Sequence, residues 1–336
     1  MKTSRSTLSF FILYFALYSP GCTGMQSALD PAGPQASRIS DLWWLFFAVC
    51  TVVFLLVIGF LLYAVGRRRR EGQLEEPQAE RRRVTAVSVA VAVTIVIMFV
   101  FLITSIRTGN RLAAFTASDP LTISVIGHQW WWEVHYSGDT PSQNMTTANE
   151  IHIPVGRPVL LKLTSQDVIH SFWVPNLHGK RDLIPGHETT LWVQADRPGV
   201  FRGQCAEFCG HQHAHMAFVV VAEPPEQFSA WLDRQRQPAS PPTDELRQQG
   251  QAVFVTGACA LCHSVQGTDA SAQVAPDLTH IASRQALAAG TVPNTRGYLA
   301  GWILDPQTVK PGAKMPSTSL TAEELHALLA YLEGLQ

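Results

Sequence analysis

Two long uncharged stretches constrain the fold of this chain more than any other feature. Residues 42–66 and 84–106 contain no charged side chain, and each can cross about 30 Å of hydrocarbon as a helix. The intervening residues 67–83 carry more arginines than glutamates, which favours a cytoplasmic loop. Trp43 and Trp44 stand at the outer end of the first stretch, as aromatic residues at a membrane interface do. The sequence therefore predicts a two-helix transmembrane hairpin whose flanking segments lie outside.

The amino-terminal segment has the features of a bacterial export signal. Lys2 and Arg5 precede an apolar stretch, so residues 1–21 are predicted to be a signal peptide. Cys22 stands where a lipoprotein signal is cleaved, which favours lipidation of this thiol and attachment to membrane lipid. An ordinary signal peptide or an uncleaved anchor is the alternative. Residues 22–41 would form a short segment on the outer side, before the first span.

The central segment changes to short alternating runs that end at prolines. Residues 119–224 therefore predict an all-β fold, a sandwich or a Greek-key barrel. The candidate strands are residues 121–125, 130–136, 159–163, 190–193 and 217–221. Residues 225–242 are rich in proline and are predicted to be a linker around a short helix.

The carboxy-terminal residues 243–336 are predicted to be an all-α domain. Candidate helices cover residues 243–255, 295–304 and 321–335. Thr321 and Glu324 have the spacing of a capping box, which would begin the last helix.

This carboxy-terminal domain contains a covalent haem signature. Cys259 and Cys262 are followed directly by His263, a pattern in which two thiols bond a c-type haem and the histidine ligates its iron. A chance or redox-active cysteine pair is the alternative. Met315 is the favoured sixth ligand, since neighbouring glycine and proline suggest a loop that can arch over a haem face, and a thioether raises the reduction potential. The competing candidates are His280 and His326.

A loop in the barrel segment combines soft metal ligands. Cys205 and Cys209 are followed by His213 and Met216, and this mixture of thiolate, imidazole and thioether favours copper over zinc. Two thiolates that bridge two copper ions account for both cysteines, whereas a mononuclear blue-copper site needs one. A disulfide between the two cysteines and a zinc site are less favoured readings of the same loop. A second histidine must come from elsewhere, and His170 is the favoured candidate. Spacing alone does not choose it over His128, His152, His178, His187, His211 or His215.

The net charge argues against one kind of partner, and the two cofactor motifs indicate one class of protein. The formal net charge of −1 argues against a nucleic-acid partner. Copper and haem in one exported chain predict a protein that transfers electrons.

Four motifs together resemble subunit II of haem–copper cytochrome c oxidases of the caa3 type, which carry a fused cytochrome c. The motifs are residues 127–130, 167–172, 182–186 and 205–216. The resemblance covers nearly all of the chain after the signal. It implies a cupredoxin Greek-key barrel with a dinuclear copper centre, CuA, followed by a class I cytochrome c domain.

The resemblance also implies roles for individual residues. The implied CuA ligands are the bridging thiolates of Cys205 and Cys209, the imidazoles of His170 and His213, the thioether of Met216 and the backbone carbonyl of Glu207. The Glu207 side chain would contribute to a magnesium site shared with subunit I, and Asp182 would lie near that subunit. Trp130 would be the aromatic residue that first receives the electron. The carbonyl of Pro276 would orient His263.

The function implied is electron input to a terminal oxidase of the bacterial inner membrane. Electrons would pass from a soluble or membrane-bound cytochrome c donor to haem c, to CuA and then to subunit I, where oxygen is reduced to water with proton pumping. Subunits I and III would be partners, and both cofactor domains would face the periplasm. The alternatives are a subunit of a CuA-containing nitric-oxide reductase and a copper-delivery lipoprotein. A quinol-oxidase subunit is excluded if copper binds, because those relatives lack the ligand cysteines.

The hairpin topology predicts the outcome of reporter fusions. A reporter that works only in the cytoplasm should be active when it is fused after Gly72, because the arginine-rich loop is retained inside. A reporter that works only outside the cytoplasm should be active when it is fused after Glu223. Each fusion is the control for the other. The opposite pattern would contradict both the localisation and the electron route.

Overall fold

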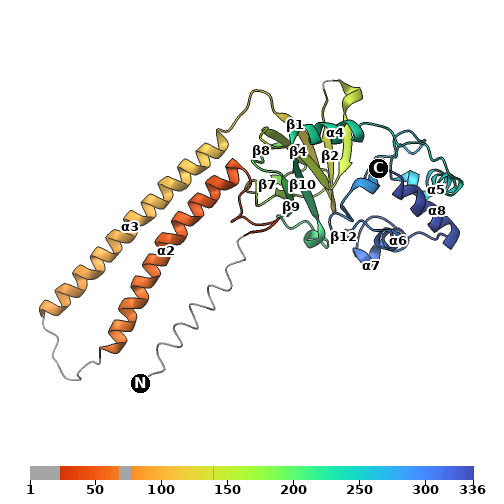
Figure 1. The fold of residues 1–336 in the computed structure, drawn as a ribbon. Helices are drawn as coiled ribbons and strands as arrows, with labels where there is room; N and C mark the ends of the chain where they lie inside the picture. Colours follow the sequence, from red (N-terminus) through yellow and green to blue (C-terminus); the bar gives the residue numbers. More distant parts are fainter. Residues whose placement is uncertain (1–22, 68–76, 139) are drawn as a thin grey trace, which may run out of the picture. The chain divides into compact units, whose positions relative to one another are not determined.

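A computed structural model describes residues 23–67, 77–138 and 140–336 (Figure 1). The signal peptide expected at residues 1–21, the lipidation site at Cys22 and most of the arginine-rich loop lie outside the described residues. The chain divides into a smaller unit, Ser37–Thr116, and a larger unit that contains the rest.

The smaller unit is a helical hairpin built from α2 (Pro34–Gly66) and α3 (Pro77–Ala113). Both helices are long and apolar enough to cross a membrane, and their most apolar windows are not buried inside the protein. A helix that is hydrophobic on all sides suits lipid, which solvates apolar side chains and leaves the backbone to bond internally. Phe46 and Phe101 stack between the helices with ring centroids 4.0 Å apart. Both helices extend beyond the predicted spans, because the helical hydrogen bonding continues into the polar flanks.

The larger unit begins with a barrel that, among the described residues, consists of two five-stranded sheets. The strand orders are β3-β2-β1-β5-β8 and β4-β10-β9-β6-β7. In chain order the strands are β1 (Leu121–His128), β2 (Trp131–Tyr136), β3 (Met145–Ala148), β4 (Glu150–Pro154), β5 (Val159–Ser165), β6 (His170–Trp173), β7 (Arg181–Leu183), β8 (Thr189–Val193), β9 (Gly199–Cys205) and β10 (Ala217–Glu223). Each strand expected from the sequence is confirmed. The others were missed because they are short, or interrupted by glycine and polar residues, or buried on both faces as β4 is.

Alternating side chains of the two sheets fill the barrel interior. Trp132 lies 5.1 Å from Phe218 and 6.1 Å from Phe172 between ring centroids, and all three rings are buried. The pairs β1–β5 and β4–β10 are parallel, whereas neighbours such as β6 and β9 are antiparallel. Because β6 and β9 are antiparallel, the start of β6 lies beside the end of β9, and these two ends carry the candidate ligands.

A helical domain completes the larger unit. The linker helix α4 (Pro225–Gln235) precedes it and packs against the barrel through Phe228 and Trp231. The elements of the helical domain are α5 (Glu245–Thr256), β11 (Ala286–Leu287), β12 (Val292–Pro293), α6 (Arg296–Leu304), α7 (Pro306–Val309) and α8 (Ala322–Glu333). The capping box predicted from Thr321 and Glu324 is present and begins α8. Gly250 of α5 lies directly against the α8 backbone at Ala327, so the absence of a side chain lets the helices approach.

Gly250→Ala should overpack the α5–α8 contact. A methyl group at this position would overlap the carbonyl oxygen of Ala327, so the helices must separate, at a cost of about 1–3 kcal/mol. We expect a lower thermal transition of this domain, measured by near-UV circular dichroism. Gly297→Ala in α6 is the matched control, since its added methyl group meets no atom within 4 Å beyond the adjacent backbone of its own helix. Equal transitions for the two variants would contradict the packing described.

Candidate metal centres

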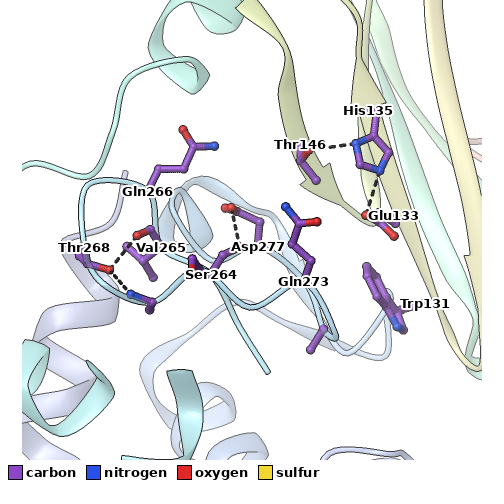
Figure 2. Close-up of a pocket in the computed structure, with 13 residues that line it drawn as sticks. Trp131, Glu133, His135, Thr146, Ser264, Val265, Gln266, Thr268, Gln273 and Asp277 are labelled. Carbon is purple, nitrogen blue, oxygen red and sulfur yellow. Dashed lines mark hydrogen bonds and ion pairs between the residues drawn. The ribbon is translucent and has the colours of Figure 1, made fainter. Parts of the chain in front are cut away.

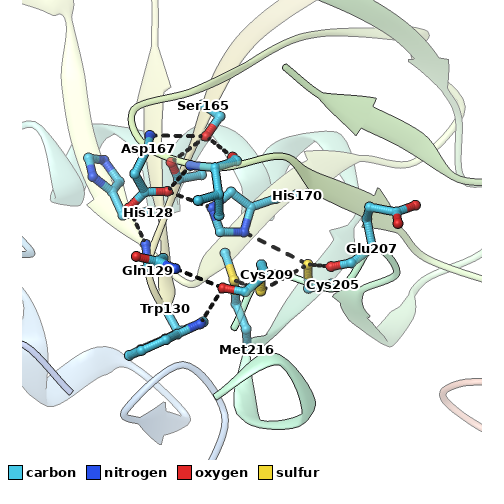
Figure 3. A network of polar contacts seen from close by, with 12 residues as sticks. His128, Gln129, Trp130, Ser165, Asp167, His170, Cys205, Glu207, Cys209 and Met216 are labelled. Atoms are coloured by element: carbon cyan, nitrogen blue, oxygen red, sulfur yellow. Dashed lines mark hydrogen bonds and ion pairs between the residues drawn. The ribbon is translucent and has the colours of Figure 1, made fainter. Parts of the chain in front are cut away.

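The soft ligands of the barrel gather at one end of it (Figure 3). His170 begins β6 and Cys205 ends β9, which places them side by side. Cys209, His213 and Met216 lie in the connection between β9 and β10. The Cys205 N–H donates to the Met216 carbonyl at 2.9 Å, which closes this connection into a tight loop.

The two thiols of this loop are close together but not bonded. Cys205 Sγ and Cys209 Sγ are 3.7 Å apart, against about 2.05 Å in a disulfide, and both residues are buried. The structure therefore contains no disulfide here. The hydrogen bond with Cys209, supported by one with His170, lowers the pKa of Cys205 to about 3, and the same pairing raises the pKa of Cys209. One sulfur is thus favoured as a thiolate, which is the form that binds metal.

Each sulfur has an imidazole neighbour of its own. His170 Nδ1 lies 3.9 Å from Cys205 Sγ, and His213 Nδ1 lies 3.6 Å from Cys209 Sγ. Ligand atoms of His170, Cys205 and Cys209 lie within 4.8 Å of one another. Such paired thiol and imidazole donors suit two soft ions better than a single zinc or blue-copper ion.

Two weaker donors complete the set, and the barrel holds the loop in place. Met216 Sδ lies 3.8 Å from Cys209 Sγ, and the Glu207 carbonyl oxygen lies 3.2 Å from Cys205 Sγ. The Cys209 carbonyl accepts two hydrogen bonds at 2.9 Å, one from the indole of Trp130 and one from the amide of Gln129. The loop is therefore anchored at its centre as well as at its ends.

Asp167 orients the His170 ring, a role that sequence analysis missed. Its Oδ1 lies 2.8 Å from His170 Nε2, which turns Nδ1 towards Cys205. Burial disfavours the charged forms of both Asp167 and His170, but hydrogen bonds outweigh this effect on their pKa values. Those from His170 and two backbone amides lower the pKa of Asp167, and those with Cys205 and Asp167 raise the pKa of His170. An acidic residue three positions before a candidate ligand was the available signal.

Three of the other candidate histidines form hydrogen bonds with side chains outside the thiol pair. His128 Nε2 is 2.8 Å from Glu133, and His152 Nε2 is 2.9 Å from Glu150. His215 Nδ1 is bonded to a glutamine side chain. In the described part of the chain, His170 and His213 are the candidates with a ring nitrogen in hydrogen-bond reach of either sulfur.

The Glu207 carboxylate is paired with a lysine. Lys180 Nζ lies 2.9 Å from Glu207 Oε2 and 3.6 Å from Asp182 Oδ1, so one cation joins both acidic residues. The described residues therefore give no support to a magnesium site at Glu207.

In the helical domain, the candidate haem ligand His263 is held in a defined orientation. Its Nδ1 lies 2.7 Å from the Pro276 carbonyl, which is the contact that the resemblance implied. Burial lowers the pKa of His263, so the neutral ring donates Nδ1–H to Pro276 and keeps Nε2 available for iron. Cys259 and Cys262 are free thiols just before it, around the short helix η4 (Ala258–Leu261).

The Gln307 side chain holds the segment that carries Met315 at three points. Gln307 Nε2 donates to the Ala313 carbonyl at 2.8 Å and to the Met315 carbonyl at 3.1 Å, while its Oε1 accepts from the Gly312 N–H at 2.8 Å. Met315 therefore lies in an ordered loop rather than in a helical core.

The two competing histidines are engaged elsewhere. Both ring nitrogens of His280 contact backbone carbonyls, of Gln336 at 2.7 Å and of Gln237 at 3.1 Å. His326 Nδ1 lies 3.0 Å from the Arg296 guanidinium. These contacts favour Met315 among the three candidates.

One contact between the barrel and the helical domain lies at β2. A cavity of about 220 Å³ separates β2 from residues 264–277 and is lined by Trp131, Glu133 and Asp277 among others (Figure 2). Burial alone would raise the pKa of Glu133, but hydrogen bonds from His128 and His135 lower it to about 2, which favours the carboxylate form of this wall residue.

Comparisons with known proteins match both domains. A family model of the cytochrome c oxidase subunit II periplasmic domain covers residues 121–223, and one of cytochrome c covers residues 248–336. Cytochrome c oxidase subunit 2 of Alkalihalophilus pseudofirmus is 36% identical over 100% of this chain and 99% of that protein. The protein of the same name from Bacillus sp. PS3 is 35% identical over 64% of this chain and 62% of its own length. The crystal structure of the periplasmic domain of subunit II of cytochrome oxidase from Bradyrhizobium japonicum has 28% identity and a TM-score of 0.34, and covers 36% of this chain and 97% of that one.

A cupredoxin barrel with an apolar hairpin before it and a cytochrome c after it is the arrangement of a subunit of a haem–copper oxidoreductase complex. Because the match to the full-length relative extends across all of these parts, the chain belongs to the cytochrome c oxidase subunit 2 family, in the form with a fused cytochrome c.

Asp167→Asn should weaken copper retention. The amide keeps the shape of the side chain but loses the charge that orients His170, and such outer partners typically contribute about 10–100-fold in metal affinity. Copper content after a chelator challenge of the purified protein measures the effect. Glu188→Gln, which removes an exposed charge paired with Lys162, should leave retention unchanged. Cys209→Ser is the positive control and should lose the dinuclear signal. Wild-type retention in Asp167→Asn would contradict the orienting role.

Proposed function

We propose that this chain is the electron-input subunit of a terminal cytochrome c oxidase. When haem c and CuA are bound, electrons pass from a cytochrome c donor through them to subunit I, where oxygen is reduced to water with proton pumping. Subunit I follows from the family, and subunit III, a soluble or membrane-bound donor and membrane lipid at Cys22 complete the proposed assembly. The proposed location is the bacterial inner membrane, with both cofactor domains on the periplasmic side.

The residues at the barrel end fit a dinuclear copper centre. The proposed ligands are the bridging Cys205 and Cys209, the terminal His170 and His213, and the weaker donors Met216 and Glu207 O. Their donor atoms already converge, so the loop needs little rearrangement to hold two ions. A donor set that the barrel fixes in this way also limits how far the ligands move when the charge of the centre changes.

The helical domain fits a covalent haem. Cys259 and Cys262 would bond it, and His263 and Met315 would ligate its iron. Arg284 supports this fit, because its guanidinium is buried and its Nε has no partner among the described residues. The charge of Arg284 also acts on His263 and lowers the pKa of that ring, so the two lie near each other. A buried N–H of this kind suits the carboxylate of a haem propionate.

One observation supports the proposed route more than any other: residues of the cytochrome domain pack over Trp130. This residue is only 9% exposed, and its indole N–H donates to the Cys209 carbonyl. Cys209 lies in the connection between β9 and β10, residues 205–216, which is called the copper loop below. Lys310 of the cytochrome domain donates to the Trp130 carbonyl, and a methyl group built at Gly312 would lie 3.9 Å from the ring. A soluble donor cannot reach Trp130 past this cover, so the cytochrome domain takes the donor's place there. A copper-delivery protein would leave this docked domain unexplained.

Met315→Ala tests the route in the intact oxidase. The haem should stay attached through Cys259 and Cys262, but its iron loses the thioether and its potential falls. Oxygen consumption with a soluble cytochrome donor should therefore drop sharply. Reduction of the copper pair by a small artificial reductant should survive, because the barrel is unchanged.

The spectrum of Met315→Ala is the internal control, since it must show the altered haem ligation. Full donor-driven oxygen consumption in a variant with that altered spectrum would mean that the cytochrome is a side branch.

A further inference from the structure

The contact between the barrel and the cytochrome domain centres on one buried lysine. Lys310 precedes the turn that leads to Met315, and its side chain is only 3% exposed. Its ammonium donates to the carbonyls of Trp130 at 2.7 Å, His215 at 2.8 Å and Ala288 at 3.0 Å. Three acceptors satisfy all three N–H groups of a lysine. Two of them belong to the barrel, where Trp130 lies beside the copper loop and His215 lies within it.

A buried lysine is a costly way to fill this space. Burial lowers the pKa of Lys310 to about 7, and among the described residues no carboxylate pairs with its ammonium. An apolar side chain of similar length would pack here without that desolvation cost. What an apolar side chain cannot supply is three directional bonds to fixed main-chain atoms of two domains.

Other contacts between the two domains lie close to Lys310 in the chain or to its acceptors. The Ala217 N–H donates to the Ala289 carbonyl at 2.9 Å, and the Gln212 side chain donates to the Pro311 carbonyl at 2.6 Å. Gly290, with a φ of +73°, lies so close to Ala217 that an added Cβ would be 3.0 Å from the Ala217 Cβ. The two backbones therefore touch directly, next to the end of the copper loop.

The position of Lys310 is passed on to Met315 through a short rigid turn. The Ala313 N–H donates to the Lys310 carbonyl at 3.0 Å. Gln307 then bonds the carbonyls of both Ala313 and Met315. A shift of Lys310 would move the proposed haem ligand with it.

We propose that Lys310 is a positioning residue that sets the distance between the Met315 loop and Trp130, and with it the rate of electron transfer from haem to copper. This inference rests on the proposed route through the fused cytochrome. Lys310 acts through the carbonyls of Trp130 and His215 rather than on the cofactors. The step transfers one electron, oxidises the haem iron, reduces the copper pair, and makes or breaks no bond.

Lys310→Met in the full purified oxidase tests the proposal. Methionine keeps much of the length of the side chain and removes the ammonium. The rate from reduced haem to copper, followed after rapid photochemical reduction, should fall several-fold, because electron tunnelling weakens with each ångström added between donor and acceptor. Hydrogen exchange at the Ala217 amide should become faster, because its acceptor Ala289 moves away. Lys162→Met, which removes an exposed lysine from β5, should change neither quantity.

Gly290→Ala is a second variant that leaves Lys310 in place and wedges a methyl group against Ala217. It should slow the same step. An unchanged transfer rate in both variants, while Met315→Ala still stops donor-driven turnover, would overturn the positioning role and leave the proposed function intact. Loss of copper or haem from Lys310→Met would also overturn it, because a positioning residue holds neither. If Met315→Ala keeps full turnover, the proposed function fails, and the directly measured haem-to-copper rate still decides the role of Lys310.

Discussion

The copper loop depends on one main-chain carbonyl. Cys209 O accepts from both Trp130 and Gln129, so the middle of the β9–β10 connection is bonded to the barrel wall. Without that anchor, two cysteines in a flexible loop of an exported protein would be free to close a disulfide. With it, the sulfurs stay 3.7 Å apart, each beside its own imidazole. The same bond ties the loop to the tryptophan that faces the cytochrome domain.

The two cofactor domains meet through buried main-chain bonds as well as through one partly exposed ion pair, in which Lys314 Nζ lies 3.4 Å from Asp167 Oδ2. Lys310, Ala217 and Gln212 all bond across the boundary to or from main-chain atoms. Exposed ion pairs contribute little and are screened by salt, whereas buried bonds to fixed carbonyls define a distance. In the proposed route, haem and copper belong to one chain and have a high effective concentration for each other, so transfer between them does not depend on repeated diffusional encounters.

Much of the fold could be predicted from local patterns. Uncharged length identified the helical hairpin, and alternation identified the regular strands, because both reflect the solvent that each face meets. The capping box fixed the start of α8 within one turn. Strands such as β4 and β9 were not predictable. β4 is buried throughout, and β9 alternates in burial but has Gly203 at an inward position, so its sequence shows no clear apolar alternation.

The candidate site divides in the same way. The sequence by itself predicted the ligand types, because cysteine, histidine and methionine four and three residues apart lie in one short segment, and because a haem signature is contiguous. Only the tertiary structure decided which histidine joins them, since His170 lies 35 residues from Cys205 and reaches it through the antiparallel β6–β9 pair. The tertiary structure also places Lys310 beside Trp130, although the two residues are 180 positions apart in the chain. Contacts at such separations depend on how packed domains exclude water from their boundary, and no local pattern records that.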